Sequence, residues 1–201
     1  MKKHTPLLIF VATVFIFVLI GCFALYLLGP MDGEIFSAVT DETTFPDLEA
    51  SMDLTSTAFA YGEPIPAKCS CKGENISPAL MWTEPPAGTK SFALIMDDPD
   101  APMGTWVHWV LFNLPPSARG LPEGVPSTPI LPDGSVQGVT SARSHGYHGP
   151  CPPSGTHRYF FKLYALDTLL TLTSSADKKS LLAAMEGHVL AQAEWMGKFS
   201  K

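Results

Sequence analysis

The sequence predicts a mainly β domain built as an antiparallel sandwich or barrel. Short apolar runs with strand character recur from residue 52 to residue 167, and proline or glycine interrupts the chain between them. The chain holds 19 prolines, and each one removes a backbone donor and fixes φ, so long regular elements are disfavoured. Short strands joined by such loops are typical of antiparallel sheets that enclose one core.

The expected strands are rich in β-branched, aromatic and other large apolar residues. They are MDLTSTAF at 52–59, ALMWTE at 79–84, SFALIMD at 91–97, TWVHWVLFNL at 105–114 and RYFFKLYALD at 158–167. The stretches 115–138 and 139–156 are irregular by contrast. Loops of that length usually carry a function or move.

One amphipathic helix is expected close to the C-terminus, over residues 175–199. Ser175 is its candidate N-cap. Apolar residues then recur at four-residue steps, which would place them on one helical face packed against the sheet. They are Leu181, Met185, Val189 and Ala193.

An apolar run without a charged residue occupies residues 7–29. As a helix it would span roughly 34 Å, which is enough to cross a bilayer. Lys2 and Lys3 precede it and acidic residues follow, so the positive-inside rule predicts a domain that faces outward. The chain is therefore divided into a membrane anchor at 1–30, a juxtamembrane linker at 31–50 and a β domain at 51–201.

Other interpretations of this run stay open. LIGC at residues 19–22 resembles a bacterial lipobox, and processing there would make Cys22 a lipidated N-terminus, although lipoproteins normally turn polar after that cysteine. A cleaved signal peptide usually has an apolar core of about 7 to 15 residues, so this run is long for one. Its length and the lack of a polar stripe argue against a buried core helix. An anchor and a lipoprotein both tether the domain to the outer side of a bacterial cell membrane.

The chain carries a formal net charge of −6, and residues 31–201 alone carry 11 basic and 19 acidic side chains, or −8. A domain this acidic is a poor general surface for nucleic acid or anionic lipid headgroups. A small anion in a local pocket is still compatible with it.

Three cysteines follow the apolar run: Cys69, Cys71 and Cys151. An oxidising compartment permits one intramolecular disulfide among them. Cys69 and Cys71 are too close in sequence for an easy bridge, so Cys151 is expected to pair with one of them. The sequence does not choose between the two.

A histidine stands near the start of two strands, where DDPDAPMGTWVHWVLFNLPP and GPCPPSGTHRYFFKLYALD each pass from a Pro/Gly turn into a strand. Side chains alternate between the faces of a strand. Residues two apart should therefore share a face with each histidine: Trp106, Val110 and Phe112 with His108, and Tyr159, Phe161 and Leu163 with His157.

If these two faces look into one cleft, the imidazoles of His108 and His157 meet the phenol of Tyr159 there. Asp98 would close the cleft from the preceding turn, and Trp106 would add a flat apolar wall. Imidazole N–H groups and a phenol hydroxyl can donate to a small oxyanion. A histidine can also become cationic when an anion binds beside it. The aspartate would favour that cation by raising the pKa of the histidine or by fixing its tautomer. The pattern predicts a pocket for one small anion.

Neighbouring polar residues have structural interpretations. Arg158 should point away from the pocket and pair with an acid such as Asp100. His145, His148 and Cys151 recur at three-residue steps, but a zinc site needs three or four firm ligands and this loop offers no fourth. We expect no metal and no cofactor, and no P-loop, nucleophile-elbow or zinc-protease motif occurs.

Six motifs occur in order between residues 51 and 197: NISPALMW, GTKSFALIMDDPDAP, WVHWVLFNLP, LPEGV, LPDGSVQG and GPCPPSGTHRYFFKLYALD. Together they resemble the phosphatidylethanolamine-binding protein family, in particular its bacterial Raf kinase inhibitor-like branch. The resemblance implies a β-sandwich of two antiparallel sheets with a C-terminal helix and a small pocket for phosphate-type groups. It implies pocket residues at Asp98, His108, His157 and Tyr159, supported by Asp100 and Arg158.

The leading functional hypothesis is a membrane-tethered domain that binds small anionic or phosphorylated ligands and regulates a partner protein as an inhibitor. A hydrolase is the first alternative, with His108 and His157 as general acid and base, Asp98 orienting one of them and Cys151 as candidate nucleophile. A purely structural envelope protein is the second alternative, and it leaves the clustered polar residues without a purpose.

Overall fold

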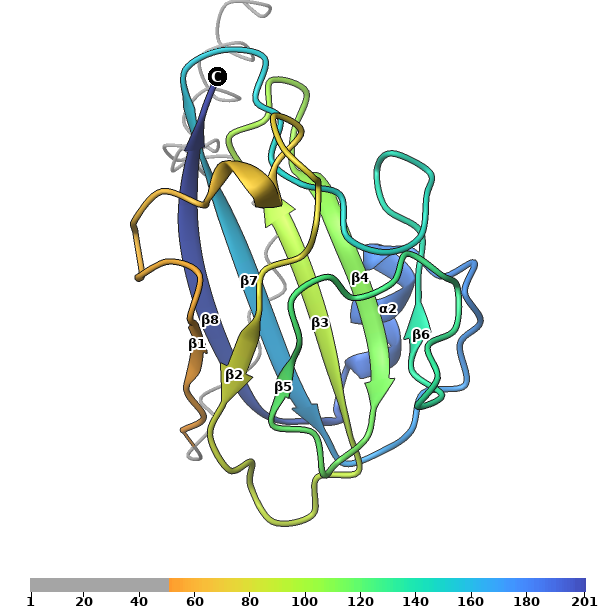
Figure 1. Ribbon diagram of the computed structural model, residues 1–201. Coiled ribbons are helices and arrows are strands. Elements are labelled where there is room, and N and C mark those ends of the chain that lie inside the picture. The colour runs from red at the N-terminus through yellow and green to blue at the C-terminus, as the bar shows by residue number, and fades with distance from the viewer. Residues whose placement is uncertain (1–50) are drawn as a thin grey trace, which may run out of the picture. The chain divides into compact units, whose positions relative to one another are not determined.

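The computed structural model describes residues 51–201, which form two antiparallel sheets (Figure 1). The smaller sheet has the strand order β1-β2-β5, with β1 at Leu54–Ser56, β2 at Leu80–Trp82 and β5 at Gly120–Leu121. The larger sheet has the order β6-β4-β3-β7-β8. Its strands are β6 at Val136–Gln137, β4 at Trp106–Leu114, β3 at Ser91–Asp98, β7 at Thr156–Leu166 and β8 at Val189–Ser200. The predicted two-sheet antiparallel fold is confirmed.

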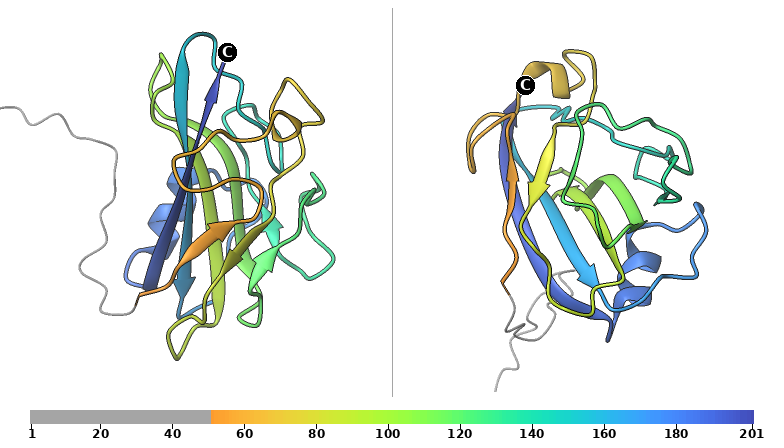
Figure 2. Two further views of the ribbon diagram at one scale, coloured as in Figure 1. Left: turned by 60° about the vertical axis from the view of Figure 1, so that its left-hand side comes forward. Right: turned by 60° about the horizontal axis from the view of Figure 1, so that its bottom comes forward.

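The main core lies between the two sheets. Trp82 and Leu80 of the smaller sheet pack there with Phe92, Trp109 and Phe161 of the larger one. The larger sheet buries its other face as well, because the helix α2, Lys178–Met185, covers it (Figure 2). All eight residues of β3 are consequently buried, which explains why its sequence is almost continuously apolar rather than alternating.

The expected helix is present only in its first third. It begins after Asp177, whose carboxylate accepts from the backbone N–H of Ser180 at 2.8 Å, so Asp177 rather than Ser175 is the N-cap. The helix ends before Gly187, which adopts a positive φ of 77°. The rest of the predicted helix is β8, paired along its length with β7.

The strand β4 contains a bulge at the start of the predicted site. Asp97 pairs with Val107 while its neighbour Met96 pairs with Trp109, so His108 is an extra residue in β4. The bulge interrupts the alternation of faces. His108 contacts the ring of Tyr159, which belongs to the main core, whereas Val110 belongs to the helix-covered core.

The predicted common face of Trp106, His108, Val110 and Phe112 is therefore wrong in part. Val110 and Phe112 lie on the helix-covered face, and His108 lies on the face of Tyr159. The residues predicted to share a face in β7 do so, because Tyr159, Phe161 and Leu163 all belong to the core between the sheets.

The long stretch 115–138 is tied to the sheet by one buried glutamine. Gln137 accepts from the indole N–H of Trp109 at 2.7 Å and donates to the carbonyls of Pro126 and Thr128, both at 2.7 Å. These bonds fix a loop whose sequence has no regular pattern, because each satisfies a polar group that would otherwise be buried alone.

Between residues 51 and 201 no helix is long and apolar enough to cross a membrane. The predicted anchor at 1–30, the linker at 31–50 and Cys22 lie outside the described residues.

Candidate ligand-binding site

A cavity of about 620 Å³ opens at one end of the larger sheet. Figure 1 shows that β3 ends at this end of the sheet, while β4 and β7 begin there. The cavity lining includes the predicted residues Asp98, Trp106, His108, His157 and Tyr159. The structure thus brings together side chains from three neighbouring strands that are up to 61 positions apart in sequence.

Asp98 and His157 form a buried pair across β3 and β7. The Nδ1 atom of His157 lies 2.7 Å from Oδ2 of Asp98 and donates to it. The other carboxylate oxygen accepts from the backbone N–H of Asp100 at 2.9 Å. Asp98 therefore holds the imidazole in the tautomer that has its proton on Nδ1, and leaves Nε2 for a ligand.

Asp100 and Arg158 form an ion pair next to the Asp98–His157 pair, between the turn after β3 and the start of β7. The guanidinium of Arg158 donates from Nε and Nη2 to the two oxygens of Asp100, at 2.9 and 2.7 Å. The backbone N–H of Arg158 also donates to Asp100 at 2.9 Å. This fork lowers the pKa of Asp100 to about 2. Neither residue lines the cavity.

His108 is fixed by the backbone of His148. Its Nδ1 atom lies 2.5 Å from the carbonyl oxygen of His148, and the backbone N–H of His148 donates to the carbonyl of His108 at 2.9 Å. The two rings stack at 5.9 Å between centroids. His108 is only 3% exposed, and this burial lowers its pKa to about 4.

Tyr159 brings a buried hydroxyl to the cavity. Its ring meets that of His108 edge to face at 5.2 Å. The hydroxyl oxygen has no hydrogen-bond partner among the residues that the structure describes. Burial, followed by the charge of Asp98 and a hydrogen-bonding interaction with the same carboxylate, raises the pKa of Tyr159, so the phenol stays protonated at neutral pH.

Apolar residues form the mouth of the cavity. Trp106 is 40% exposed at the start of β4, and Met103 in the β3–β4 turn is fully exposed. Pro152 and Pro153 line the approach to β7. The site therefore has polar groups inside and an apolar rim, which is typical of pockets for small organic ligands.

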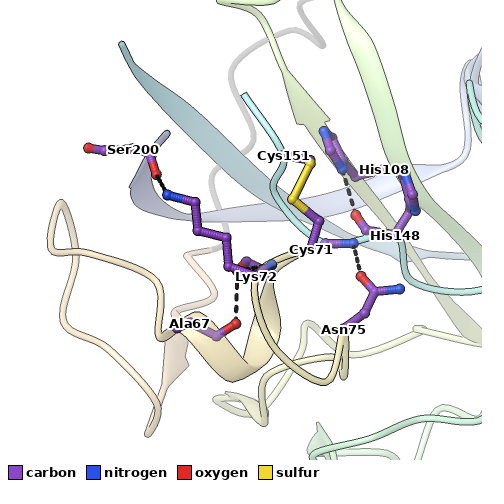
Figure 3. The surroundings of a disulfide bond; sticks show 10 residues. Ala67, Cys71, Lys72, Asn75, His108, His148, Cys151 and Ser200 are labelled. Carbon is purple, nitrogen blue, oxygen red and sulfur yellow. Dashed lines mark hydrogen bonds between the residues drawn. A yellow bond between two sulfur atoms is a disulfide. The ribbon is translucent and has the colours of Figure 1, made fainter. Parts of the chain in front are cut away.

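A disulfide between Cys71 and Cys151 holds the wall of the cavity (Figure 3). It is one of the two pairings that the sequence left open, and Cys69 is a buried free thiol. The same two loops are joined by the backbone bond from Cys71 N–H to Pro150 at 3.1 Å. Gly149 donates to Asn75 at 2.7 Å, and a Cβ at Gly149 would lie 2.5 Å from the carbonyl of Cys69, so only glycine fits this contact.

Sequence reasoning missed several lining residues, among them His148 and Ser141, which come from the irregular stretch 139–156. The repeated histidines of that stretch are the sequence signal that points to such residues. His145 instead hydrogen bonds through Nδ1 to the carbonyls of Gln137 and Gly138. Within residues 51–201 no group of three or more His, Cys, Asp or Glu side chains is placed to hold a metal ion.

The fold and the site define a class of protein: a two-sheet β-sandwich with a polar, histidine-bearing pocket at the end of its larger sheet. Residues 55–200 match the family model described as phosphatidylethanolamine-binding protein. The chain therefore belongs to the phosphatidylethanolamine-binding protein family.

Relatives span the same domain. A UPF0098 protein of Methanothermobacter thermautotrophicus is 55% identical over 150 residues, which is 75% of this chain and 99% of the relative. A solved phosphatidylethanolamine-binding protein homologue, CT736 of Chlamydia trachomatis, is 45% identical with a TM-score of 0.69, covering 75% of this chain and 98% of its own. YbcL of E. coli, described as a member of the mammalian family, is 33% identical with a TM-score of 0.70, covering 76% and 99%.

Protonation of His108 should couple to stability in a definite direction. The unfolded chain takes up this proton near pH 6.5, whereas the folded protein resists it down to pH about 4. The unfolded state binds more protons between these values, so the free energy of unfolding should fall as pH decreases. For this residue alone we expect a loss of about 2 kcal/mol between pH 7 and pH 5.

Urea unfolding of the wild type and of His108→Gln at both pH values measures this loss, which the variant should lack. His188→Gln is the matched control, because His188 is exposed and far from the site in sequence. Equal pH dependence in the wild type and His108→Gln would contradict the expected coupling.

The disulfide should stabilise the domain by restricting its unfolded state. The cysteines are 80 residues apart, and loops of this size are worth about 2 to 4 kcal/mol when closed. We expect Cys71→Ser/Cys151→Ser to lose this amount in chemical denaturation. Reduction of the wild type or of Cys69→Ser should have the same effect, while a reductant should leave the double variant unchanged.

Proposed function

We propose that residues 51–201 bind one small phosphate-type anion in the cavity between His108, His157 and Tyr159. The observation that carries this proposal is the convergence of both imidazoles and the hydroxyl of Tyr159 on one cavity, where that buried hydroxyl has no closely aligned hydrogen-bond partner within the described part of the chain. Buried hydroxyls are nearly always hydrogen bonded, so an acceptor from outside the protein fits this place.

His157 supports an anionic ligand through its bond with Asp98. The carboxylate keeps a proton on Nδ1, and a second proton on Nε2 would turn the ring into an imidazolium next to the anion. The negative charge of Asp98 would then stabilise that cation, so that ligand and aspartate flank it. Trp106 and Met103 at the mouth suit a ligand with a short organic substituent on the anion.

Binding without catalysis is favoured over the hydrolase alternative by the state of Cys151. Its sulfur is bonded to Cys71, so the candidate nucleophile is not available as a thiolate. His108 and His157 could still exchange protons with a ligand, but the hydrolase hypothesis loses the nucleophile that the sequence offered and would depend on a water activated by one of these histidines. A purely structural role would leave the hydroxyl of Tyr159 and the Asp98–His157 pair unexplained.

We further propose that the apolar run at 7–29 tethers the domain to the outer side of a membrane, where it regulates a partner protein as an inhibitor. The disulfide supports an oxidising compartment, since such bonds persist mainly outside the cytosol. The acidic charge of residues 31–201 supports a small ligand rather than nucleic acid.

Phosphate binding can be tested on the full chain in mild detergent. We expect inorganic phosphate and phosphoethanolamine to shift the ring signals of His108 and His157 in NMR spectra, because both rings line the cavity. His108→Ala and His157→Ala should each lower the affinity at least about tenfold, the effect of losing one charge-assisted hydrogen bond. His188→Ala should bind as the wild type does. Saturable shifts of equal size in all variants would refute the proposed site.

Tethering can be tested by fractionating bacterial cells that express the full chain. We expect it in the membrane fraction and cleavable by protease added outside the inner membrane, and deletion of residues 1–30 should release it. Incorporation of a labelled fatty acid that is lost in Cys22→Ala would assign lipidation, and membrane retention without label would assign an uncleaved anchor. Recovery of the full chain in the soluble fraction would contradict both.

A further inference from the structure

The disulfide between Cys71 and Cys151 lies at the cavity and is open to solvent. Both cysteines are exposed, and Cys151 belongs to the cavity lining. Figure 3 shows the bond beside His108 and His148. Cys69, by contrast, is buried, and this burial raises the pKa of its thiol. Exposed disulfides are generally the ones that exchange with external thiols, so this bond is within reach of a thiol in the folded protein.

The chain just before Cys151 is held by contacts that do not need the disulfide. Hydrogen bonds of 2.6 to 3.1 Å tie residues 147–150 to other parts of the domain. They run from the Tyr147 hydroxyl to the Cys69 carbonyl, from His148 N–H to the His108 carbonyl, from Gly149 N–H to Asn75 and from Cys71 N–H to the Pro150 carbonyl. Loss of the disulfide should therefore leave residues 147–150 in place.

Residues 151–154 depend on the disulfide much more. Pro152 and Pro153 have no backbone N–H, and within residues 51–201 no hydrogen bond to another backbone group holds this stretch. The first such bond after it runs from the N–H of Lys201 to the carbonyl of Gly155, at 3.0 Å. Pro152 is buried, but it adds only packing without direction. The disulfide is the covalent tie that fixes the backbone here.

The same short stretch faces the proposed ligand. Cys151, Pro152 and Pro153 all line the cavity. The backbone of Cys151 also lies close enough to the hydroxyl of Tyr159 for a weak hydrogen-bonding interaction, which lowers the pKa of that phenol against the larger, raising effect of burial. A shift of residues 151–154 would change both the apolar rim and the surroundings of a hydroxyl that is expected to bind the anion.

We propose that formation of the Cys71–Cys151 disulfide activates the site, so that the oxidised chain binds its anion and the reduced chain binds it weakly. One cysteine thiolate attacks an external disulfide and forms a mixed disulfide, and the other cysteine then displaces the external dithiol as the Sγ–Sγ bond forms. The protein loses two electrons and two protons, and the external pair gains them. A chain in an oxidising compartment thus has a complete cavity wall. This regulation rests on the proposed anion binding.

Calorimetric titration with phosphoethanolamine compares the two redox states of the full chain in mild detergent. We expect the oxidised chain to bind at least about tenfold more tightly than the chain kept in excess dithiothreitol, which is the effect of one misplaced hydrogen bond. Reoxidation should restore the affinity. Equal affinity of both states would overturn the redox control and leave anion binding intact. Binding by neither state would remove the proposed function and the control with it.

The ligand must in turn protect the disulfide, because coupling between two equilibria is reciprocal. In defined mixtures of reduced and oxidised dithiothreitol, with free thiols counted by alkylation, saturating phosphoethanolamine should shift the midpoint by about tenfold in the equilibrium constant. This shift corresponds to about 30 mV toward more negative potential. Cys69→Ser should show the same shift, since its thiol takes no part in the exchange, and ethanolamine should cause none. A midpoint that ignores phosphoethanolamine while the oxidised chain binds it would contradict the proposal.

A measurement without ligand tests the structural step alone. Reduction of the wild type should lower the NMR order parameters of the backbone N–H groups of Cys151 and Ser154, while Gly149 and the strand β8 keep theirs. The unchanged β8 signals would show that the reduced domain is still folded. Cys71→Ser/Cys151→Ser should resemble the reduced wild type in mobility and in affinity. Order parameters at Cys151 and Ser154 that do not respond to reduction would refute the proposal, whatever the ligand.

Discussion

The hydrogen bond between Asp98 and His157 is the interaction on which the site depends. Asp98 ends β3 and His157 lies at the start of β7, and the bond joins these adjacent strands where the ladder gives way to loops. The carboxylate also accepts from Asp100, which is in turn held by the fork of Arg158. One acidic turn therefore fixes the tautomer of the histidine and the position of the strand that carries it.

His108 is held by a different set of contacts from His157. His108 occupies a bulge, which turns it toward Tyr159, and the carbonyl of His148 then sets its tautomer. That carbonyl lies in a loop clamped by the disulfide and by the contact of Gly149 with Asn75. The two imidazoles are thus prepared for different roles, because one pairs with a carboxylate and the other with a neutral carbonyl.

The sequence predicted the antiparallel sheets and five of the polar or aromatic cavity residues, but the end of the helix, the bulge in β4 and the loop residues escaped it. Leu181, Met185, Val189 and Ala193 are four residues apart, and four is also an even number, so the same spacing fits one face of a strand. Only Gly187 marks the change from helix to strand. The bulge at His108 has no sequence signal in a single chain, since it depends on how β3 pairs with β4. Loop residues such as His148 are placed by tertiary contacts alone.

The central claim is that these groups converge on one small anion. A crystal structure of the protein grown with phosphoethanolamine tests it most directly. The account predicts a tetrahedral phosphate within hydrogen-bonding distance of Nε2 of His108, Nε2 of His157 and the hydroxyl of Tyr159. A cavity filled by water alone at saturating ligand, with the side chains in the same places, would contradict it.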